Sequence, residues 1–238
     1  MSDVPVGTAV DAALRERLTA LEEDLQAPRT SNSTFAAIRS RRKASADIYQ
    51  VAKDHPGAVY RLLPSLVESL QMELTREWPA ADVLVYKSLS RDIQHHITAT
   101  LALMVRPDLI TSSRATGHSL EPVIAVLAET LAESTVRDSN RAALRGLGTL
   151  CNAIPEEVAT VVSVPRVGPA VGHLITMATA HRHLRAGARV LLVLAREMPA
   201  EGIESSPVQN GIAKLADCGD PRCRIYRGLW AERSRDHT

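Results

Sequence analysis

Two cysteines near the end of the chain have the spacing of half a zinc site. Cys218 and Cys223 are separated by four residues in the segment CGDPRC, and two thiolates placed in this way can ligate one Zn²⁺ ion. A structural zinc site needs four ligands, and the sequence has no second CxxC or HxxxH pair; His237 is the one imidazole nearby. Two free thiols beside a turn are the alternative, and we expect neither a metal nor a cofactor.

The histidine pairs do not have the spacing of metal ligands on a helix. His95 and His96 are adjacent, and His181 and His183 are two apart, whereas side chains on one helical face recur at i+3 or i+4. The sequence also lacks a glycine-rich phosphate loop, a GxSxG turn and an HExxH motif. These observations predict a protein that is not an enzyme.

Arginines recur at fixed distances before three prolines. Fourteen positions before Pro56, Pro155 and Pro199 the sequence has Arg42, Arg141 and Arg185. Ten positions before Pro155 and Pro199 it has Arg145 and Arg189. If the segments stack, these five arginines form a ladder that could contact the phosphates of a nucleic acid. Isoleucines occupy both ladder positions before Pro107, and Asp138 lies near the ladder. A solvated helix face is therefore the alternative, and the sequence favours it.

The arginines belong to a repeated pattern of helices. Four segments have the periodicity of a helix, reach a proline (Pro56, Pro107, Pro155, Pro199) and start a second helix. The eighth, fifth and fourth positions before each proline are apolar: Ile48, Val51, Ala52; Ala99, Ala102, Leu103; Leu147, Leu150, Cys151; Leu191, Leu194, Ala195. Such offsets place three residues on one helical face.

The second helices have a still more regular pattern. Apolar residues at i, i+3, i+4, i+7, i+8 and i+11 run over 59–70, 120–131 and 167–178, with a shortened copy at 208–216. Loops are expected at 111–119 and 161–166, where the copies are interrupted. The repeated register after each proline predicts four related helical pairs.

This arrangement resembles the HEAT-repeat family over residues 34–217. The prolines lie 51, 48 and 44 residues apart, near the ~40–47 residues of HEAT and armadillo units. Asp54 and Arg61 occupy the turn where HEAT units carry an acidic and a basic residue, although the later units lack this pair. HEAT-fold iron hydroxylases carry His-Glu dipeptides, and this sequence contains none.

The resemblance implies an all-α fold, an α-solenoid of three to four degenerate HEAT-like pairs with helical caps at both ends. It also implies a scaffold whose concave face, lined by the second helices, binds a protein or peptide partner. Nucleic-acid binding through the five arginines is the alternative function. An irregular helical bundle, in which the prolines merely end helices, is the alternative fold.

Composition agrees with a helical protein of this kind. Hydrophobic residues make up 45%, charged residues 23% and aromatic residues only 3%, which suits close helix packing better than a β-sandwich. The net charge of +1 means that an electrostatic partner must be bound through a local patch.

The expected organisation is a helix and linker at 1–32, the repeat domain at 33–217 and a capping helix with a polar tail at 218–238. The cap would point Ile225, Leu229 and Trp230 inward. Three cysteines do not make an even disulfide framework, no secretory signal is visible, and no apolar run approaches ~18 residues. We therefore expect a cytoplasmic protein without a membrane partner.

Overall fold

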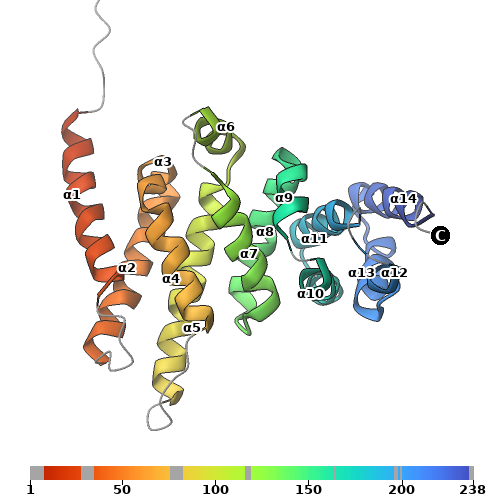
Figure 1. Ribbon diagram of the computed structural model, residues 1–238, viewed down its shortest axis with the longest axis horizontal. Coiled ribbons are helices and arrows are strands. Elements are labelled where there is room, and N and C mark those ends of the chain that lie inside the picture. The colour runs from red at the N-terminus through yellow and green to blue at the C-terminus, as the bar shows by residue number, and fades with distance from the viewer. Residues whose placement is uncertain are drawn as a thin grey trace, which may run out of the picture. The chain divides into compact units, whose positions relative to one another are not determined.

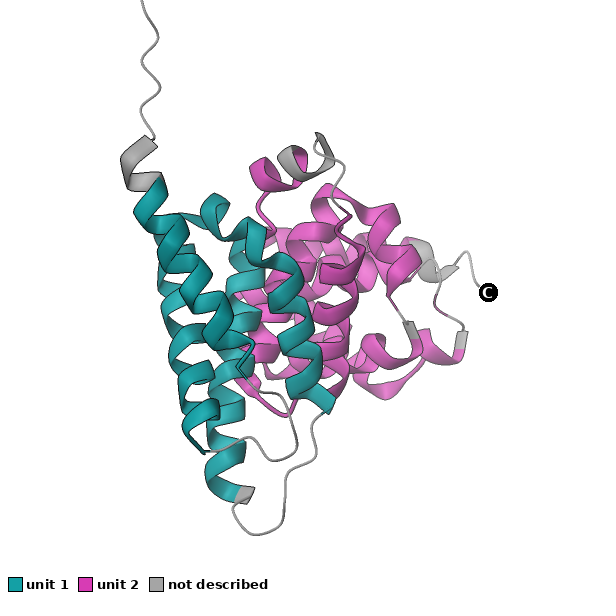
Figure 2. Cartoon of the chain, turned by 60° about the vertical axis from the view of Figure 1, so that its left-hand side comes forward, with its two compact units in different colours: residues 1–104 teal, residues 105–238 magenta. Residues whose placement is uncertain are grey.

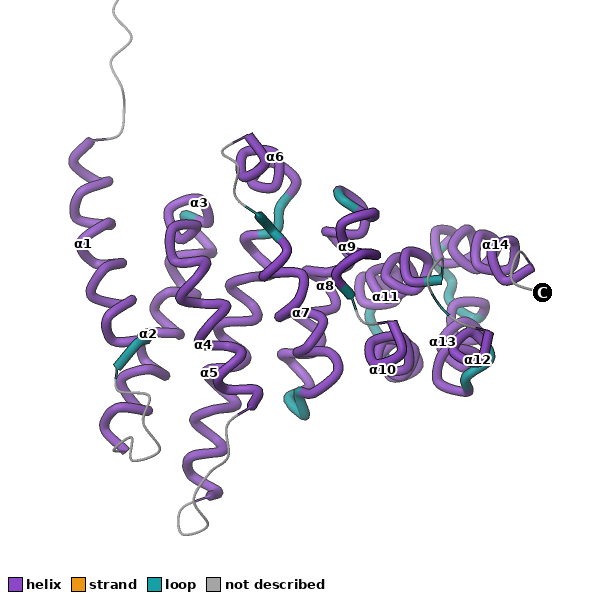
Figure 3. The backbone as a smooth tube through the Cα atoms, viewed as in Figure 1, coloured by secondary structure: helices purple, strands orange, loops and turns teal. Residues whose placement is uncertain are grey.

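The chain is helical throughout the part that the structure describes. The computed structural model describes residues 8–27, 35–75, 83–115, 119–162, 164–195, 198 and 200–235. Every regular element in these ranges is a helix (Figures 1 and 3), so the predicted all-α class is confirmed. The chain divides into two compact units, residues 1–104 and 105–238 (Figure 2), and this boundary lies inside the region predicted as one repeat domain.

The described residues of unit 1 form four long helices and one short connection. These are α1 (Thr8–Leu25), α2 (Phe35–Asp54), α4 (Leu63–Thr75) and α5 (Val83–Met104), with α3 (Pro56–Val59) and the 3₁₀ turn η1 (Tyr60–Leu62) between α2 and α4. Helix α2 packs on α1 and α5, and α4 packs on α5 and α1. The core between them consists of aliphatic side chains such as Leu18, Ile48, Leu66 and Ile97.

In the described part of unit 2 there are two rows of helices and three short connecting helices. Row A contains α8 (Arg137–Ala153), α11 (His181–Leu194) and α14 (Pro221–Arg235); row B contains α7 (Glu121–Glu133), α10 (Val164–Met177) and α13 (Ser206–Ala216). Neighbours within each row pack on one another, and α7–α8, α10–α11 and α13–α14 pack between the rows. The connections are α6 (Pro107–Ala115), α9 (Pro155–Val161) and α12 (Ala200–Ile203).

The prolines that define the repeat start short helices. Pro56, Pro107 and Pro155 are the first residues of α3, α6 and α9, a position where the missing N–H and the fixed φ angle of proline cost nothing. Because α6 extends to Ala115, it occupies much of the predicted 111–119 loop, and that prediction was wrong. Residues 116–118 lie outside the described ranges.

The apolar stripes on the second helices form the core in two of the three full copies. All six positions are buried in the copies at 59–70 and 120–131. In the copy at 167–178, Ala170 and Leu174 are half-exposed instead of buried. Two glycines explain the difference: a Cβ on Gly172 would lie 2.4 Å from the Pro207 carbonyl oxygen, and one on Gly211 would lie 2.9 Å from the Gly172 carbonyl oxygen. Helix α10 therefore turns its glycine side to α13 and leaves Leu174 half-exposed.

We expect Gly172→Ala to destabilise unit 2 by ~1–3 kcal/mol, because backbone atoms of α13 cannot move away from the added methyl group as a flexible side chain would. Gly228→Ala is the matched control, since no atom lies within 4 Å of its Cβ position. The control should gain ~0.5–1 kcal/mol from helix propensity. Urea unfolding followed by circular dichroism measures both changes, and equal effects would show that α10 and α13 are not in close contact.

A buried ion pair joins the helices of unit 1. The Arg41 guanidinium on α2 lies 2.7 Å from a Glu73 carboxylate oxygen on α4, and both side chains are almost wholly buried. Arg41 Nε also donates to the Leu25 carbonyl oxygen at the end of α1 (3.1 Å), and Ser90 Oγ of α5 donates to Glu73 (2.5 Å). The network therefore connects all four long helices of the unit.

Helix α14 packs differently from the prediction for the capping helix. Trp230 is buried, as expected, but Ile225 is 61% exposed and Leu229 is 42% exposed. The two outward residues occur at i and i+4, whereas Cys223 and Trp230 occupy the inner side of the helix. The inward orientation predicted for Ile225 and Leu229 was therefore wrong.

Among the described residues, no single helix is long and apolar enough to cross a membrane. One bent pair, Pro155–Val161 with Pro165–Met177 at 117°, has sufficient length and composition only when its two helices are taken together. Val158, Val167, Val171 and Ile175 of this pair are buried inside unit 2, which accounts for its apolar composition.

Candidate functional site: the arginine face of row A

The two helix rows of unit 2 carry very different charges. Row A contains nine arginines with described side chains and two carboxylates, Asp138 and Glu232. Row B contains three glutamates and two basic residues, Arg166 and Lys214. Charge is also divided between the helices of unit 1. Helices α2 and α5 together have seven basic and three acidic residues, whereas α1 and α4 together have two basic and seven acidic residues. The near-zero net charge thus conceals a strong separation of charge.

Three arginines of α8 and α11 act electrostatically on one histidine of α11. Burial lowers the pKa of His183, and the guanidiniums of Arg182, Arg145 and Arg141 lower it further. Arg145 and Arg182 are exposed, and neither side chain has an ion pair or a hydrogen bond with the residues that the structure describes. Two free guanidiniums beside a neutral imidazole can bind carboxylates or phosphates, for which arginine has a planar set of donors.

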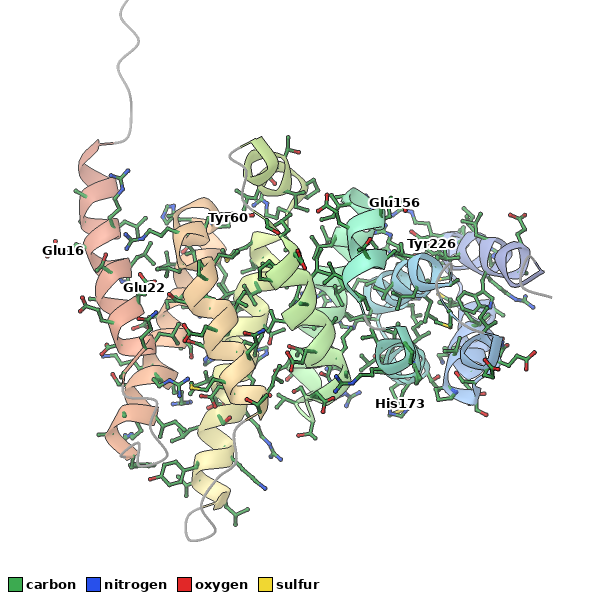
Figure 4. All side chains as sticks on the ribbon, in the orientation of Figure 1. Glu16, Glu22, Tyr60, Glu156, His173 and Tyr226 are labelled. Carbon is green, nitrogen blue, oxygen red and sulfur yellow. The ribbon has the colours of Figure 1, made fainter. Side chains whose placement is uncertain are left out.

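The five arginines of the predicted ladder have different environments. Arg42 belongs to unit 1 and pairs with Asp92 (2.5 Å). In unit 2, Arg141 pairs with Asp138 (3.1 Å) and Arg185 with Asp220 (3.6 Å). The Nε of Arg189 donates to the Tyr226 hydroxyl (2.7 Å), and Figure 4 labels this tyrosine. Of the five, Arg145 alone has no such partner among the described residues.

Sequence reasoning missed Arg182, which lies between the two histidines of the HRH segment and belongs to the cluster. It also missed the arginines that extend row A at its ends: Arg137, Arg222, Arg224 and Arg227. A charge count for each expected helix, instead of for the whole chain, would have found both. The proline-based register selected the arginines fourteen and ten positions before a proline, whereas Arg182 lies seventeen positions before Pro199, the offset that Arg39 has from Pro56.

The cysteines have the properties of buried thiols. Cys151, Cys218 and Cys223 are free and buried. Burial raises the pKa of Cys151 to about 12, and burial together with a hydrogen bond to Cys218 raises the pKa of Cys223 to about 12. Within the described ranges, no three His, Cys, Asp or Glu side chains are grouped to hold a metal ion. His237, considered as a third ligand, lies outside those ranges.

Unit 1 contains a pocket of about 390 Å³ between α1 and the α3–η1 connection, lined by Leu14, Arg15, Leu18, Gly57, Ala58 and Arg61. An Arg61 Nη donates to the Arg15 carbonyl oxygen (2.6 Å) and to Thr19 Oγ (2.8 Å). These bonds attach η1 to α1, so Arg61 has a structural role at the rim of the pocket.

No protein-family model and no curated protein matches the sequence. Two crystal structures, each described only as an engineered protein of the Northeast Structural Genomics Consortium, are similar in structure. The first has a TM-score of 0.50 and 15% identity over 92% of this chain and 98% of the other. The second has a TM-score of 0.43 and 17% identity over 92% and 97%. The first similarity concerns the fold alone.

Proposed function

We propose that the protein is a non-enzymatic, cytoplasmic scaffold of HEAT-like helical pairs that binds an acidic segment of a partner protein. The observation that supports this proposal best is the excess of arginine on row A, where the side chains of Arg145 and Arg182 are exposed and have no ion pair with the described residues. The packing of neighbours within row A and within row B agrees with a solenoid. The helices of row B belong to the second helices, which were expected to line a concave face. They have few basic residues to attract an acidic segment.

The arginine side chains of row A suit a protein partner better than a nucleic acid. Asp138 and Asp220 lie among the arginines at 3.1 and 3.6 Å from Arg141 and Arg185, and both would repel a continuous phosphate backbone. Discrete carboxylates of an acidic peptide can bind Arg145 and Arg182 without contacting either aspartate. Stacking aromatics for single-stranded bases are also scarce, because row A has only Tyr226 and Trp230, and Trp230 is buried.

The proposal predicts that the full chain binds a fluorescent oligo-glutamate peptide, with affinity that falls as salt increases. The double substitution Arg145→Gln with Arg182→Gln should weaken binding by about tenfold or more, since each removes a charge-assisted hydrogen bond. Fluorescence anisotropy at low salt measures the affinities. Arg166→Gln is the matched control: it removes an exposed arginine from row B, where Arg166 pairs with Glu133.

A loss of binding free energy for Arg166→Gln of about half that of the double variant would mean that the peptide senses overall charge and has no site on row A, because the double variant removes two charges and the control removes one. A duplex DNA probe is the second arm. Tighter binding to the duplex, with a log–log salt slope of about −0.9 for each phosphate contacted, would replace the proposed acidic protein with a nucleic acid.

A further inference from the structure

The outward side of α14 carries large apolar residues next to arginine. Arg222, Ile225, Leu229 and Glu232 follow the spacing i, i+3, i+7, i+10 and are all exposed. Tyr226, on the same side, contacts Arg189 of α11, so this stripe begins next to the arginines of row A. Gly228 adds open space beside the stripe, with no atom within 4 Å of its Cβ position. Exposed apolar side chains of this kind mark an interaction surface. Because arginine lies beside them, we expect a partner surface that has small side chains to pack against and acidic residues.

Helix α1 has such a face. Ala13, Glu16, Ala20 and Glu23 have the same i, i+3, i+7, i+10 spacing and are all exposed, whereas Leu18, Leu21 and Leu25 point into unit 1. Alanines leave shallow holes on a helix surface, into which larger side chains of another helix can insert. The two glutamates of this stripe are available, because no ion pair involves either of them among the described residues.

We infer that the α14 stripe of one chain docks on the α1 stripe of a second copy, with Ile225 and Leu229 packed beside the alanines of α1. Arg222 then lies near a carboxylate of the same stripe. Helix α14 has five arginines and one glutamate, and α1 has five acidic and two basic residues, so the two helices attract each other. This head-to-tail contact joins different surfaces, and it uses neither Arg145 nor Arg182, so it is independent of the proposed function.

Sedimentation velocity of the full chain tests the contact. The average mass should rise with protein concentration and fall with added salt. Ile225→Ser with Leu229→Ser should raise the dissociation constant about tenfold or more, because two apolar side chains lose their burial. Arg222→Glu alone, and Glu16→Arg with Glu23→Arg, should each weaken association as well. All of these residues are exposed, and unchanged thermal unfolding of each variant will show that the fold is retained.

The decisive sample is a mixture of the two charge-reversed chains. The Arg222→Glu chain keeps a wild-type α1 and the Glu16→Arg, Glu23→Arg chain keeps a wild-type α14. One native contact can therefore form between the two chains, so association should return in the mixture and stay weak for each alone. A wild-type chain that stays monomeric at all concentrations overturns the inference. Association that is insensitive to the α1 variants also overturns it, because α14 would then bind another surface.

Discussion

Leu127→Asp is expected to unfold unit 2 or leave it barely stable. Leu127 is fully buried on α7, and an unpaired carboxylate in such a place costs several kcal/mol. The stability of a domain is only ~5–15 kcal/mol. Far-UV circular dichroism during urea unfolding should show a large loss of the helical signal at low denaturant.

Leu174→Asp is the matched control for this substitution. Leu174 holds the same i+7 position in its own copy of the stripe, and the sequence pattern alone predicts an equal loss for Leu66→Asp, Leu127→Asp and Leu174→Asp. Since Leu174 is half-exposed, its aspartate stays hydrated, and we expect a loss of ~1 kcal/mol or less, as for most surface substitutions. Equal losses of stability in Leu127→Asp and Leu174→Asp would contradict the orientation of α10 in which Gly172 faces α13.

Glu73→Leu should destabilise unit 1 by ~3–5 kcal/mol, because it leaves the buried Arg41 guanidinium without its carboxylate. The double variant Arg41→Met with Glu73→Leu should recover most of that loss, since a buried ion pair exchanged for apolar side chains is often near neutral. Urea unfolding of the single and double variants gives the coupling energy.

Arg42→Met provides the comparison at the adjacent residue. Its pair with Asp92 leaves the side chains 49% and 41% exposed, so water and salt screen it, and the expected loss is ~0–1 kcal/mol. A cost for Arg42→Met as large as that for Glu73→Leu would show that burial does not determine the difference between these two ion pairs.

Most of the fold was accessible from the sequence because apolar spacing determines which helix face is buried. The stripes at 59–70 and 120–131 are buried at every predicted position. The prediction for the third copy was wrong at Leu174, because a hydrophobic pattern does not take glycines into account. Gly172 and Gly211 nevertheless set the distance between α10 and α13. The orientation of α14 failed for a related reason: two adjacent candidate faces, Ile225 with Leu229 and Cys223 with Trp230, have similar hydrophobicity.

The candidate site was accessible only in part. Arg141 and Arg145 were selected from their distance to a proline, and both lie near His183. The partners of the other arginines could not be predicted, because Asp92, Asp220 and Tyr226 come from helices or loops distant in sequence. The buried pair of Arg41 and Glu73 was invisible for the same reason.

The titration of His183 by NMR tests the proposed binding face most directly. Burial and, after it, the charges of Arg182, Arg145 and Arg141 lower the pKa of His183 below the ordinary value of 6.5. A bound oligo-glutamate peptide would offset the charge of the arginines and raise the pKa again. His96 serves as the internal control, because burial and the neighbouring His95 lower its pKa in unit 1. We predict that saturating peptide raises the pKa of His183 and leaves that of His96 unchanged. Peptide that binds without moving the pKa of His183, or that moves both histidines equally, would contradict an acidic-partner site on row A.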